Sequence, residues 1–310
     1  MSLTWEDENR PVDLHVHTTA SDGATSPSGC VDEAKRNGLA AIAITDHDTT
    51  AGNAEAVARG RDEGVEVVPG VEVSVEHKSL TIHLLGYYPD SDAPEVQAVL
   101  TGLRGHRDER NPRILAKLAE LGCPLDYGEL LAEARGGVVG RPHIAALMIR
   151  RRYVRDLNEA FDRYLAKGAP AYVERCKPTP EAAIQALLAA RAVPVLAHPG
   201  AMGAGSEEEI DALVAQLVAG GLRGIEAYYH ASSPVQVASC LGLARRYGLL
   251  VTGGSDYHGA RKPDIRMGRG PSGMHVPYRL LVELKKARER LRGDLRSQTA
   301  DRKSEMPACW

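Results

Sequence analysis

Histidines and acidic residues occur in this sequence at spacings that suit a metal centre. His15 and His17 are separated by Val16, and in an extended strand residues two apart point to the same side. Both imidazoles can therefore reach one cation. Asp256 and His258 repeat this spacing near the other end of the chain, so two distant segments each offer a pair of ligand-type side chains.

Further imidazole and carboxylate groups lie in or just after apolar segments. Asp22 follows the first such segment in the loop SDG, and a second segment ends in TDHD, which contains His47. Glu72, His83 and His198 belong to three later segments. Each histidine alone could be a satisfied core residue. A buried ring of unpaired imidazoles and carboxylates would be very costly in desolvation without cations or hydrogen bonds, so the conjunction favours a metal centre.

The elements that must position these residues are short apolar segments alternating with amphipathic ones. We expect strands at 12–17, 39–45, 65–75, 81–88, 193–199, 224–229 and 249–254. Helical patterns separate several of them, and Pro27 and Pro180 stand where a first helical turn accepts proline. This alternation predicts an α/β fold with a mostly parallel sheet or barrel, whose strand ends would bring the ligand-type residues together.

Residues 93–170 interrupt the alternation, because they contain helical patterns and no convincing strand. We interpret them as a helical insertion domain. The remaining core would then be discontinuous, formed by 11–92 and 171–290, and 291–310 would be a polar tail.

The bulk composition limits the possible functions. A chain of 310 residues with 43% hydrophobic and 25% charged residues suits a globular protein. It has no stretch of roughly 18 uncharged apolar residues and no signal peptide, so no membrane association is expected. Five scattered cysteines without CxxC spacing suggest reduced thiols in the cytoplasm. The net charge of −3 gives no bulk attraction to nucleic acid, so any phosphate recognition must be local.

Six motifs carry a resemblance to a known family. HVHTTASDG, AIAITDHDT, GVEVSV, HLLG, AHPG and GSDYHG resemble, in order, the motifs of the PHP (polymerase and histidinol phosphatase) family. The resemblance covers about 12–88 and 193–259. It implies a distorted (β/α)7 barrel and a metal-dependent phosphoesterase with two or three divalent metal ions.

Carried onto this sequence, the resemblance implies three metal subsites, of which the first two share Glu72. In order, the subsites would take His15, His17, Glu72 and Asp256; Glu72, His83 and His198; and Asp22, His47 and His258. Many relatives have a histidine where this chain has Asp22. Mixed nitrogen and oxygen ligands suit Mn²⁺, which we expect here, with Zn²⁺ or Fe²⁺ as alternatives.

The expected insertion carries a second resemblance. RDERNPR, GRPHIA and KGAPAYV resemble segments of a PHP subgroup that acts on small nucleotides. Arginines bind phosphate through paired hydrogen bonds, so Arg110, Arg113 and Arg141 are candidates for holding a phosphate that is not cleaved. For Arg113 a solvated helical face is an equal alternative. The other candidate substrate contacts are Asn111, His143 and Lys167.

Four residues are candidates for catalytic roles. Asp256 or His258 could orient the attacking water, and His198 or His230 could assist the departure of the leaving oxygen. The chain departs from the family after the sixth strand, where many relatives resemble EVYHPSHS and this chain reads EAYYHASS. Tyr229 stands there at a position often occupied by an imidazole, and His230 is not counted as a ligand.

We therefore expect a metal-dependent phosphomonoesterase whose substrate is a 3′,5′-nucleoside bisphosphate, giving a nucleoside 5′-monophosphate and phosphate. The alternatives are a 5′→3′ exoribonuclease acting on short RNA oligomers, a histidinol-phosphate phosphatase, and a non-catalytic metal-binding module. The last is disfavoured because all nine ligand positions carry ligand-type side chains. No protein partner is expected.

Overall fold

The computed structural model describes residues 9–78, 80–201, 206–270 and 273–304, and its centre is a seven-stranded sheet in the order β1 to β7. All seven predicted strands are confirmed, with ends that shift by at most three residues. The strands are β1 (Val12–Val16), β2 (Ala41–Ile44), β3 (Glu66–His77), β4 (Leu80–Tyr87), β5 (Val193–Leu196), β6 (Gly224–Tyr229) and β7 (Leu250–Gly254).

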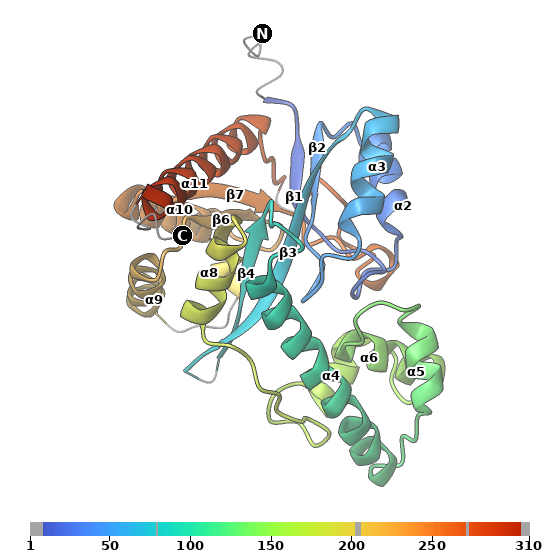
Figure 1. The fold of residues 1–310 in the computed structure, drawn as a ribbon. Helices are drawn as coiled ribbons and strands as arrows, with labels where there is room; N and C mark the ends of the chain where they lie inside the picture. Colours follow the sequence, from blue (N-terminus) through green and yellow to red (C-terminus); the bar gives the residue numbers. More distant parts are fainter. Residues whose placement is uncertain (1–8, 79, 202–205, 271–272, 305–310) are drawn as a thin grey trace, which may run out of the picture.

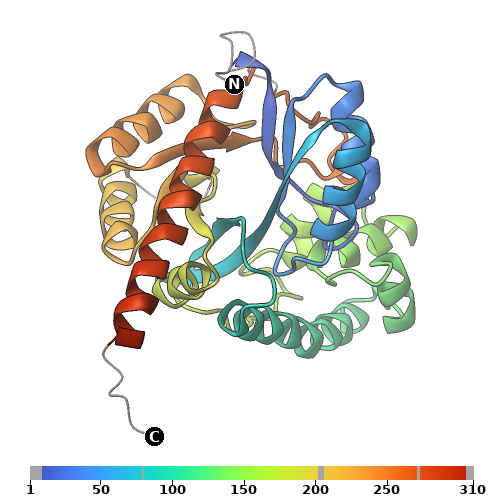
Figure 2. The ribbon, with the colours of Figure 1, turned by 45° about the horizontal axis from the view of Figure 1, so that its top comes forward.

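The sheet curls into a barrel that closes between its first and last strands. Val16 pairs with Tyr257 in a parallel bridge, and the His17 N–H donates to the Tyr257 carbonyl oxygen at 2.9 Å. Gly254 lies so close to β1 that a Cβ there would be 2.4 Å from the Cβ of His15. Helices surround the strands (Figure 2), so the predicted distorted (β/α)7 barrel is confirmed.

β4 is the source of the distortion. It runs antiparallel to both β3 and β5, whereas the other neighbouring strands in the order are parallel. β3 ends at His77 and β4 begins at Leu80, and so short a connection permits only an antiparallel hairpin. Because β4 is reversed, His83 in its first half lies beside the end of β5, where the Ala197 N–H donates to the His83 carbonyl oxygen at 3.1 Å.

Several helices of the barrel start where the sequence provides a side-chain cap. α2 begins at Pro27 after Ser26, whose hydroxyl accepts from the Gly29 N–H at 3.1 Å. The segment expected as a polar tail is helical as far as Ser304, and residues 305–310 of that prediction lie outside the described residues. These helices are α2 (Pro27–Arg36), α3 (Asn53–Glu63), α8 (Pro180–Ala189), α9 (Glu207–Ala219), α10 (Pro234–Tyr247) and α11 (Tyr278–Ser304).

Between β4 and α8, the described chain contains helices and no strand (Figure 1). The apolar side chains of this region form their own cluster, which includes Leu118, Leu130 and Leu147. The first half of α4 instead packs Leu100 and Leu103 into the cluster of β3, β4 and α8, so α4 belongs to both cores. The division into barrel and insertion domain stays a prediction. The helices are α4 (Pro94–Glu120), α5 (Tyr127–Glu133), α6 (Arg141–Arg150) and α7 (Leu157–Ala160), followed by a π-helical turn at Phe161–Leu165.

No helix in the described part of the chain combines the length and apolar character that a bilayer span requires. Cys30, Cys123, Cys176 and Cys240 are free thiols. Cys309 lies outside the described residues.

Candidate metal centre

The nine side chains predicted as metal ligands meet at one rim of the barrel. They come from six strands or the loops that follow them, and each is buried or partly buried. The structure therefore brings together every predicted ligand. Groups of three or four of them have ligand atoms within 4.8 Å of one another: His15, His17 and Asp256; His15, Glu72 and His198; His47, Glu72 and His83; and His17, Asp22, His47 and His258.

Glu72 lies at the centre of these groups, and its two carboxylate oxygens face different histidines. Oε1 lies 2.9 Å from His83 Nδ1 and 3.1 Å from His198 Nε2. Oε2 lies 3.2 Å from His17 Nε2 and 3.0 Å from His47 Nδ1. A carboxylate placed in this way can bridge two cations, as the family resemblance implies.

Asp256 also divides its two oxygens between different neighbours. Oδ1 lies 3.1 Å from His17 Nε2 and 3.7 Å from His15 Nε2. Oδ2 accepts hydrogen bonds from Lys262 Nζ at 2.8 Å and from the Tyr229 hydroxyl at 3.2 Å. One oxygen is therefore presented to the histidines while the other is held in place.

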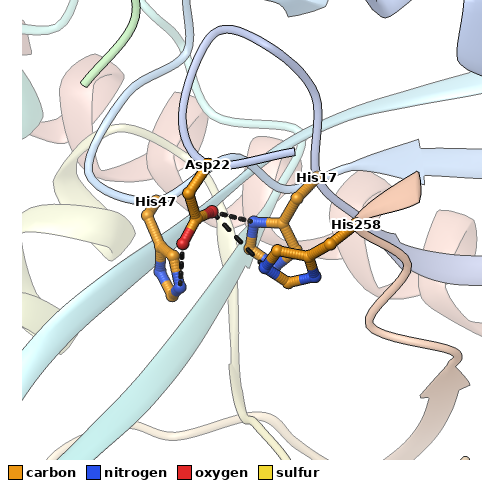
Figure 3. Close-up of side chains that lie close together, drawn as sticks. All are labelled: His17, Asp22, His47 and His258. Carbon is orange, nitrogen blue, oxygen red and sulfur yellow. Dashed lines mark ion pairs between the residues drawn. The ribbon is translucent and has the colours of Figure 1, made fainter. Parts of the chain in front are cut away.

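The carboxylate of Asp22 lies between three imidazoles (Figure 3). Its oxygens are 3.4 Å from His258 Nε2, 3.7 Å from His17 Nδ1 and 3.9 Å from His47 Nε2. The predicted third subsite contained Asp22, His47 and His258. The structure adds His17, whose other ring nitrogen faces Glu72, so His17 lies between two of the groups.

The spacing of these atoms fits divalent cations. Ligand atoms about 2.1 Å from a common ion, at tetrahedral or octahedral angles, lie about 3.0–3.4 Å apart, close to the separations above. Mixed imidazole and carboxylate ligands suit Mn²⁺, Zn²⁺ and Fe²⁺ alike. Within the described part of the chain, several buried ligand-type atoms also lack a partner with hydrogen-bond geometry, namely His17 Nδ1, His47 Nδ1, Glu72 Oε2, His83 Nδ1 and His198 Nδ1.

Burial and neighbouring charges shift the pKa values of the cluster in opposite directions. Burial lowers the pKa of His17, but the carboxylates of Asp256 and Glu72 outweigh it and raise that pKa to about 9. Burial lowers the pKa of His47 to about 3, which the Glu72 carboxylate opposes only in part. Burial would raise the pKa of Glu72, but the imidazoles of His47 and His83 hold it well below 4.5. Protons and cations therefore compete for the same atoms.

Glu226 in β6 was not predicted, although it contacts two candidate ligands. Its carboxylate lies 3.0 Å from His15 Nδ1 and accepts the backbone N–H of His198 at 2.8 Å. A proton on Nδ1, directed to Glu226, leaves the Nε2 lone pair of His15 toward the cluster. The signal that could have identified Glu226 is a carboxylate inside the otherwise apolar segment GIEAYY.

Two further buried carboxylates hold the segments that carry ligands. Asp13 accepts the backbone N–H groups of His15 at 3.2 Å and Ser255 at 2.9 Å. Asp46 accepts the Ser21 hydroxyl at 2.6 Å. The residue after Ser255 and the residue after Ser21 are both candidate ligands. Nothing in the sequence distinguishes these supporting carboxylates from ligands, because both types occupy strand ends.

Two candidate ligands have a backbone conformation that is unusual for residues other than glycine. His198 has φ of 29° and Asp256 has φ of 53°. Each such residue costs about 1–3 kcal/mol and persists only where its surroundings fix it, as they often do at functional sites. Glu226 binds the His198 backbone, and Asp13 binds the residue before Asp256.

Two cavities adjoin the cluster, and His47, His83, Pro142 and Phe161 line both of them. The metal cavity has a volume of about 480 Å³ and is lined, besides candidate ligands, by Leu157, Tyr229, Arg261 and Lys262. The arginine cavity has a volume of about 140 Å³ and is lined, among others, by Arg107, Arg110, Arg141, Arg175 and Lys177.

The predicted substrate contacts in α4 have different surroundings. Arg110 lines the arginine cavity, as Arg141 of α6 does. Asn111 is buried and accepts a hydrogen bond from Arg110 at 2.9 Å, so it positions that arginine. Arg113 is exposed and lines neither cavity, because it falls outside the buried face of α4. Arg107 lies on that face and was missed, since sequence alone did not fix the phase of the helix.

Three other predicted residues also lie outside the two cavities. Lys167 is exposed. His143 is buried and lines a third cavity, and its Nδ1 accepts the Gly140 N–H at 3.0 Å. His230 is half-buried beside Tyr229, with ring centroids 4.4 Å apart, and burial lowers its pKa. The structure does not bring these three side chains to the metal cavity.

A (β/α)7 barrel that gathers imidazoles and carboxylates at one rim, beside a cavity lined by arginines, defines a metal-dependent phosphoesterase. Comparison with known proteins agrees with this class, because the PHP domain matches residues 13–174. The chain therefore belongs to the PHP family.

Individual relatives cover most of the chain. It is 33% identical over 248 residues to the 3′,5′-nucleoside bisphosphate phosphatase of Chromobacterium violaceum. The aligned region covers 80% of this chain and 87% of that protein. It is 32% identical over 289 residues to the 5′-3′ exoribonuclease Rnm of Escherichia coli, covering 90% and 96%. A solved structure from Bifidobacterium adolescentis, described as a proposed metal-dependent phosphoesterase, has a TM-score of 0.82 at 29% identity and covers 90% and 96%.

Proposed function

We propose that this protein is a phosphomonoesterase that removes one phosphate from a small nucleotide with two phosphates. The substrate class is a 3′,5′-nucleoside bisphosphate, and the products are a nucleoside 5′-monophosphate and phosphate. The observation that carries this proposal is the arginine cavity directly beside the metal cavity. Similarity to a protein named 3′,5′-nucleoside bisphosphate phosphatase supports it.

The arginine cavity has the charge that a retained phosphate requires. Among the described residues, neither Arg110 nor Arg141 forms an ion pair with a carboxylate; Arg110 donates to Asn111 Oδ1 and Arg141 to the Leu165 carbonyl oxygen at 2.8 Å. Burial and the nearby guanidinium of Arg107 lower the pKa of Arg110 to about 8. A phosphate bound by these guanidinium groups would offset the cost of burying them.

Asp48 joins the arginine cavity to the metal centre. Arg107 Nε donates to Asp48 Oδ2 at 3.0 Å, and Arg175 lies 3.3 Å from the same oxygen. Asp48 directly follows the candidate ligand His47 at the end of β2. One carboxylate thus orients two of the four arginines and leaves the cavity cationic.

The candidate ligands would hold two or three divalent cations, for which we propose Mn²⁺. When bound, the cations supply Lewis-acid charge that stabilises the developing charge on the phosphoryl oxygens and acidifies an attacking water. The Nδ1–H of His258 donates to the Asp256 carbonyl oxygen at 2.8 Å, so its Nε2 lone pair faces Asp22. This geometry suits His258 as a ligand and favours Asp256 for orienting the water.

His198 and His230 were both candidates for assisting the leaving oxygen. His198 lines the metal cavity, whereas His230 does not. His198 is therefore within reach of a substrate bound in the metal cavity. The geometry therefore favours His198 for this role.

A second candidate function is the trimming of short RNA oligomers from the 5′ end. The third cavity, with a volume of about 320 Å³, shares Leu157 and Arg261 with the metal cavity. It could accept the nucleotide that follows a cleaved phosphodiester. Similarity to proteins named 5′-3′ exoribonuclease favours the same reading.

Substitution of Arg141 tests the retained phosphate. Losing a charged, paired hydrogen bond costs roughly 2–3 kcal/mol, or about 30- to 150-fold in kcat/KM. We expect Arg141→Ala to show this loss on a 3′,5′-nucleoside bisphosphate and little loss on an aryl phosphate, which has no second phosphate. Arg141→Lys should recover only part, because an ammonium cannot reproduce the guanidinium geometry. Phosphate release under equal metal loading is the measurement.

The matched control is Arg113→Ala, which removes an exposed arginine of the same region and should change neither rate by more than about threefold. An equal fractional loss on both substrates after Arg141→Ala would contradict a phosphate-binding role. A 5′-phosphorylated dinucleotide, assayed alongside, separates the two candidate functions. Faster cleavage of the dinucleotide than of the bisphosphate would favour the exoribonuclease.

A further inference from the structure

Lys262 is a cation that lines the metal cavity, although it is not a candidate metal ligand and does not line the arginine cavity. It follows the short helix η3 (Gly259–Arg261), its side chain is 36% exposed, and its Nζ lies 2.8 Å from Asp256 Oδ2. Among the described residues that line this cavity, Arg261 is the other permanent cation. Arg261 differs from Lys262 in that its carboxylate partner, Glu133 of α5 at 3.2 Å, does not line the metal cavity.

The ammonium group of Lys262 has donors to spare. A lysine Nζ carries three N–H donors, and in the described part of the chain one of them has a hydrogen-bond acceptor, Asp256. The Asp256 Oδ2 atom also receives the Tyr229 hydroxyl, so Lys262 is not the sole support of that carboxylate. Its position, exposure and remaining donors fit an anion that enters the metal cavity.

We propose that Lys262 binds a non-bridging oxygen of the scissile phosphate while it remains bonded to Asp256. The phosphate of a phosphomonoester brings about two negative charges into a cavity that already contains Asp22, Glu72 and Asp256. A compact ammonium at its edge opposes that charge without occupying a ligand position. This inference rests on the proposed metal ligands and is independent of the nucleotide preference.

Binding of inorganic phosphate, the reaction product, tests the proposal without requiring turnover. The affinity of manganese-loaded protein for phosphate is measured by titration calorimetry, together with bound metal and kcat/KM on an aryl phosphate. We expect Lys262→Met to weaken phosphate binding about 10- to 100-fold and to lower kcat/KM similarly, with metal content unchanged. Lys262→Arg should retain part of both.

Two variants separate phosphate binding from support of Asp256. Tyr229→Phe removes the other hydrogen bond to Asp256 Oδ2, so its effect measures what support of that carboxylate contributes, and Lys262→Met should weaken phosphate binding by more than this. Lys285→Met is the matched control, because Lys285 is also 36% exposed and pairs with a carboxylate, Glu66, remote from the cavity. It should leave all three measurements unchanged.

Two outcomes would overturn the inference. In the first, both Lys262 variants bind phosphate as wild type does, while metal content falls, so that Lys262 merely holds Asp256. In the second, loaded wild-type protein binds no phosphate at all. Failure of the proposed function is a different result, in which phosphate binds through Lys262 but nucleoside bisphosphates are not preferred substrates.

Discussion

An imidazole nitrogen that carries a proton and donates a hydrogen bond cannot bind a cation. The lone pair of the other ring nitrogen is then the one available to a metal ion. His15 is held by Glu226, and His258 is held by the Asp256 carbonyl oxygen, so both present Nε2 to the cluster. His15 and His17 could be predicted as candidate ligands from their spacing, because HxH in a strand has a geometric meaning, whereas His83 and His198 were assigned through the family resemblance. Glu226 was not predicted, because a single acid in a strand does not reveal what it binds.

Glu226→Gln should weaken metal binding while the fold is retained. The amide can still accept from His15, but its NH2 group then faces the backbone N–H of His198, where two donors oppose each other. We expect metal affinity to fall about 10- to 100-fold, with activity partly restored by excess Mn²⁺. Bound metal at limiting Mn²⁺, measured by mass spectrometry of the ions, checks this.

The corresponding control is Glu283→Gln, at an exposed residue of α11 that pairs only with Lys286 among the described residues. It should leave metal content as in wild type. Unchanged metal affinity in Glu226→Gln would show that Glu226 does not position the ligands.

At the scale of elements, the contact between β1 and β7 carries the most candidate ligands. His15 lies in β1 and His17 directly follows it, while Asp256 and His258 follow β7. Gly254 allows the two strands to approach, because a Cβ at that position would lie 2.4 Å from both the N and the Cβ of His15. Strand packing and ligand placement therefore depend on the same glycine.

Gly254→Ala should destabilise the protein and disturb the metal centre together. The added methyl group must push β7 from β1, and overpacking of this kind costs about 1–3 kcal/mol. Gly242→Ala is the control, because a Cβ at Gly242 in α10 meets nothing within 4 Å and should stabilise the helix by up to ~1 kcal/mol. Urea unfolding of both variants gives the comparison. Equal stability of Gly254→Ala and wild type would contradict the tight contact.

Most of the elements could be predicted from the sequence, because apolar periodicity marks buried strands and proline marks helix starts. The reversed direction of β4 was missed. It depends on the length of the connection, and the predicted ends at 75 and 81 made that connection longer than the structure shows. In α4, Arg113 was predicted and Arg107 was not, because which arginines face the cavity depends on helical phase. Tertiary packing sets that phase, so sequence could not fix it.

At the scale of the whole molecule, metal binding and stability are linked through protons. The pKa of His17 is raised to about 9, above its usual 6.5. The protonated imidazole of His17 pairs with carboxylates and thereby stabilises the metal-free fold. This contribution to stability is complete below about pH 6.5 and is lost as pH rises through about 9. Cations must displace that proton, so metal binding is weaker at the acid end of this range.

We expect the half-saturating Mn²⁺ concentration to fall about tenfold per pH unit between pH 6.5 and 9 for each displaced proton. A free Mn²⁺ concentration of about 100 times its Kd should add roughly 2.7 kcal/mol to the free energy of unfolding. The Tm measured against Mn²⁺ concentration at pH 6.5, 7.5 and 8.5 gives both the half-saturating concentration and the gain in stability. His106→Gln, at a partly exposed histidine outside the cluster, should leave the pH dependence unchanged. A half-saturating concentration independent of pH would contradict the competition.

The adjacency of His47 and Asp48 has a consequence for which molecules fit. One side chain faces the metal centre and the next binds the arginines, and consecutive Cα atoms are about 3.8 Å apart. A single peptide unit therefore separates the residue that faces the metal centre from the residue that orients Arg107 and Arg175. On the proposed function, discrimination by substrate length belongs to the backbone at the end of β2.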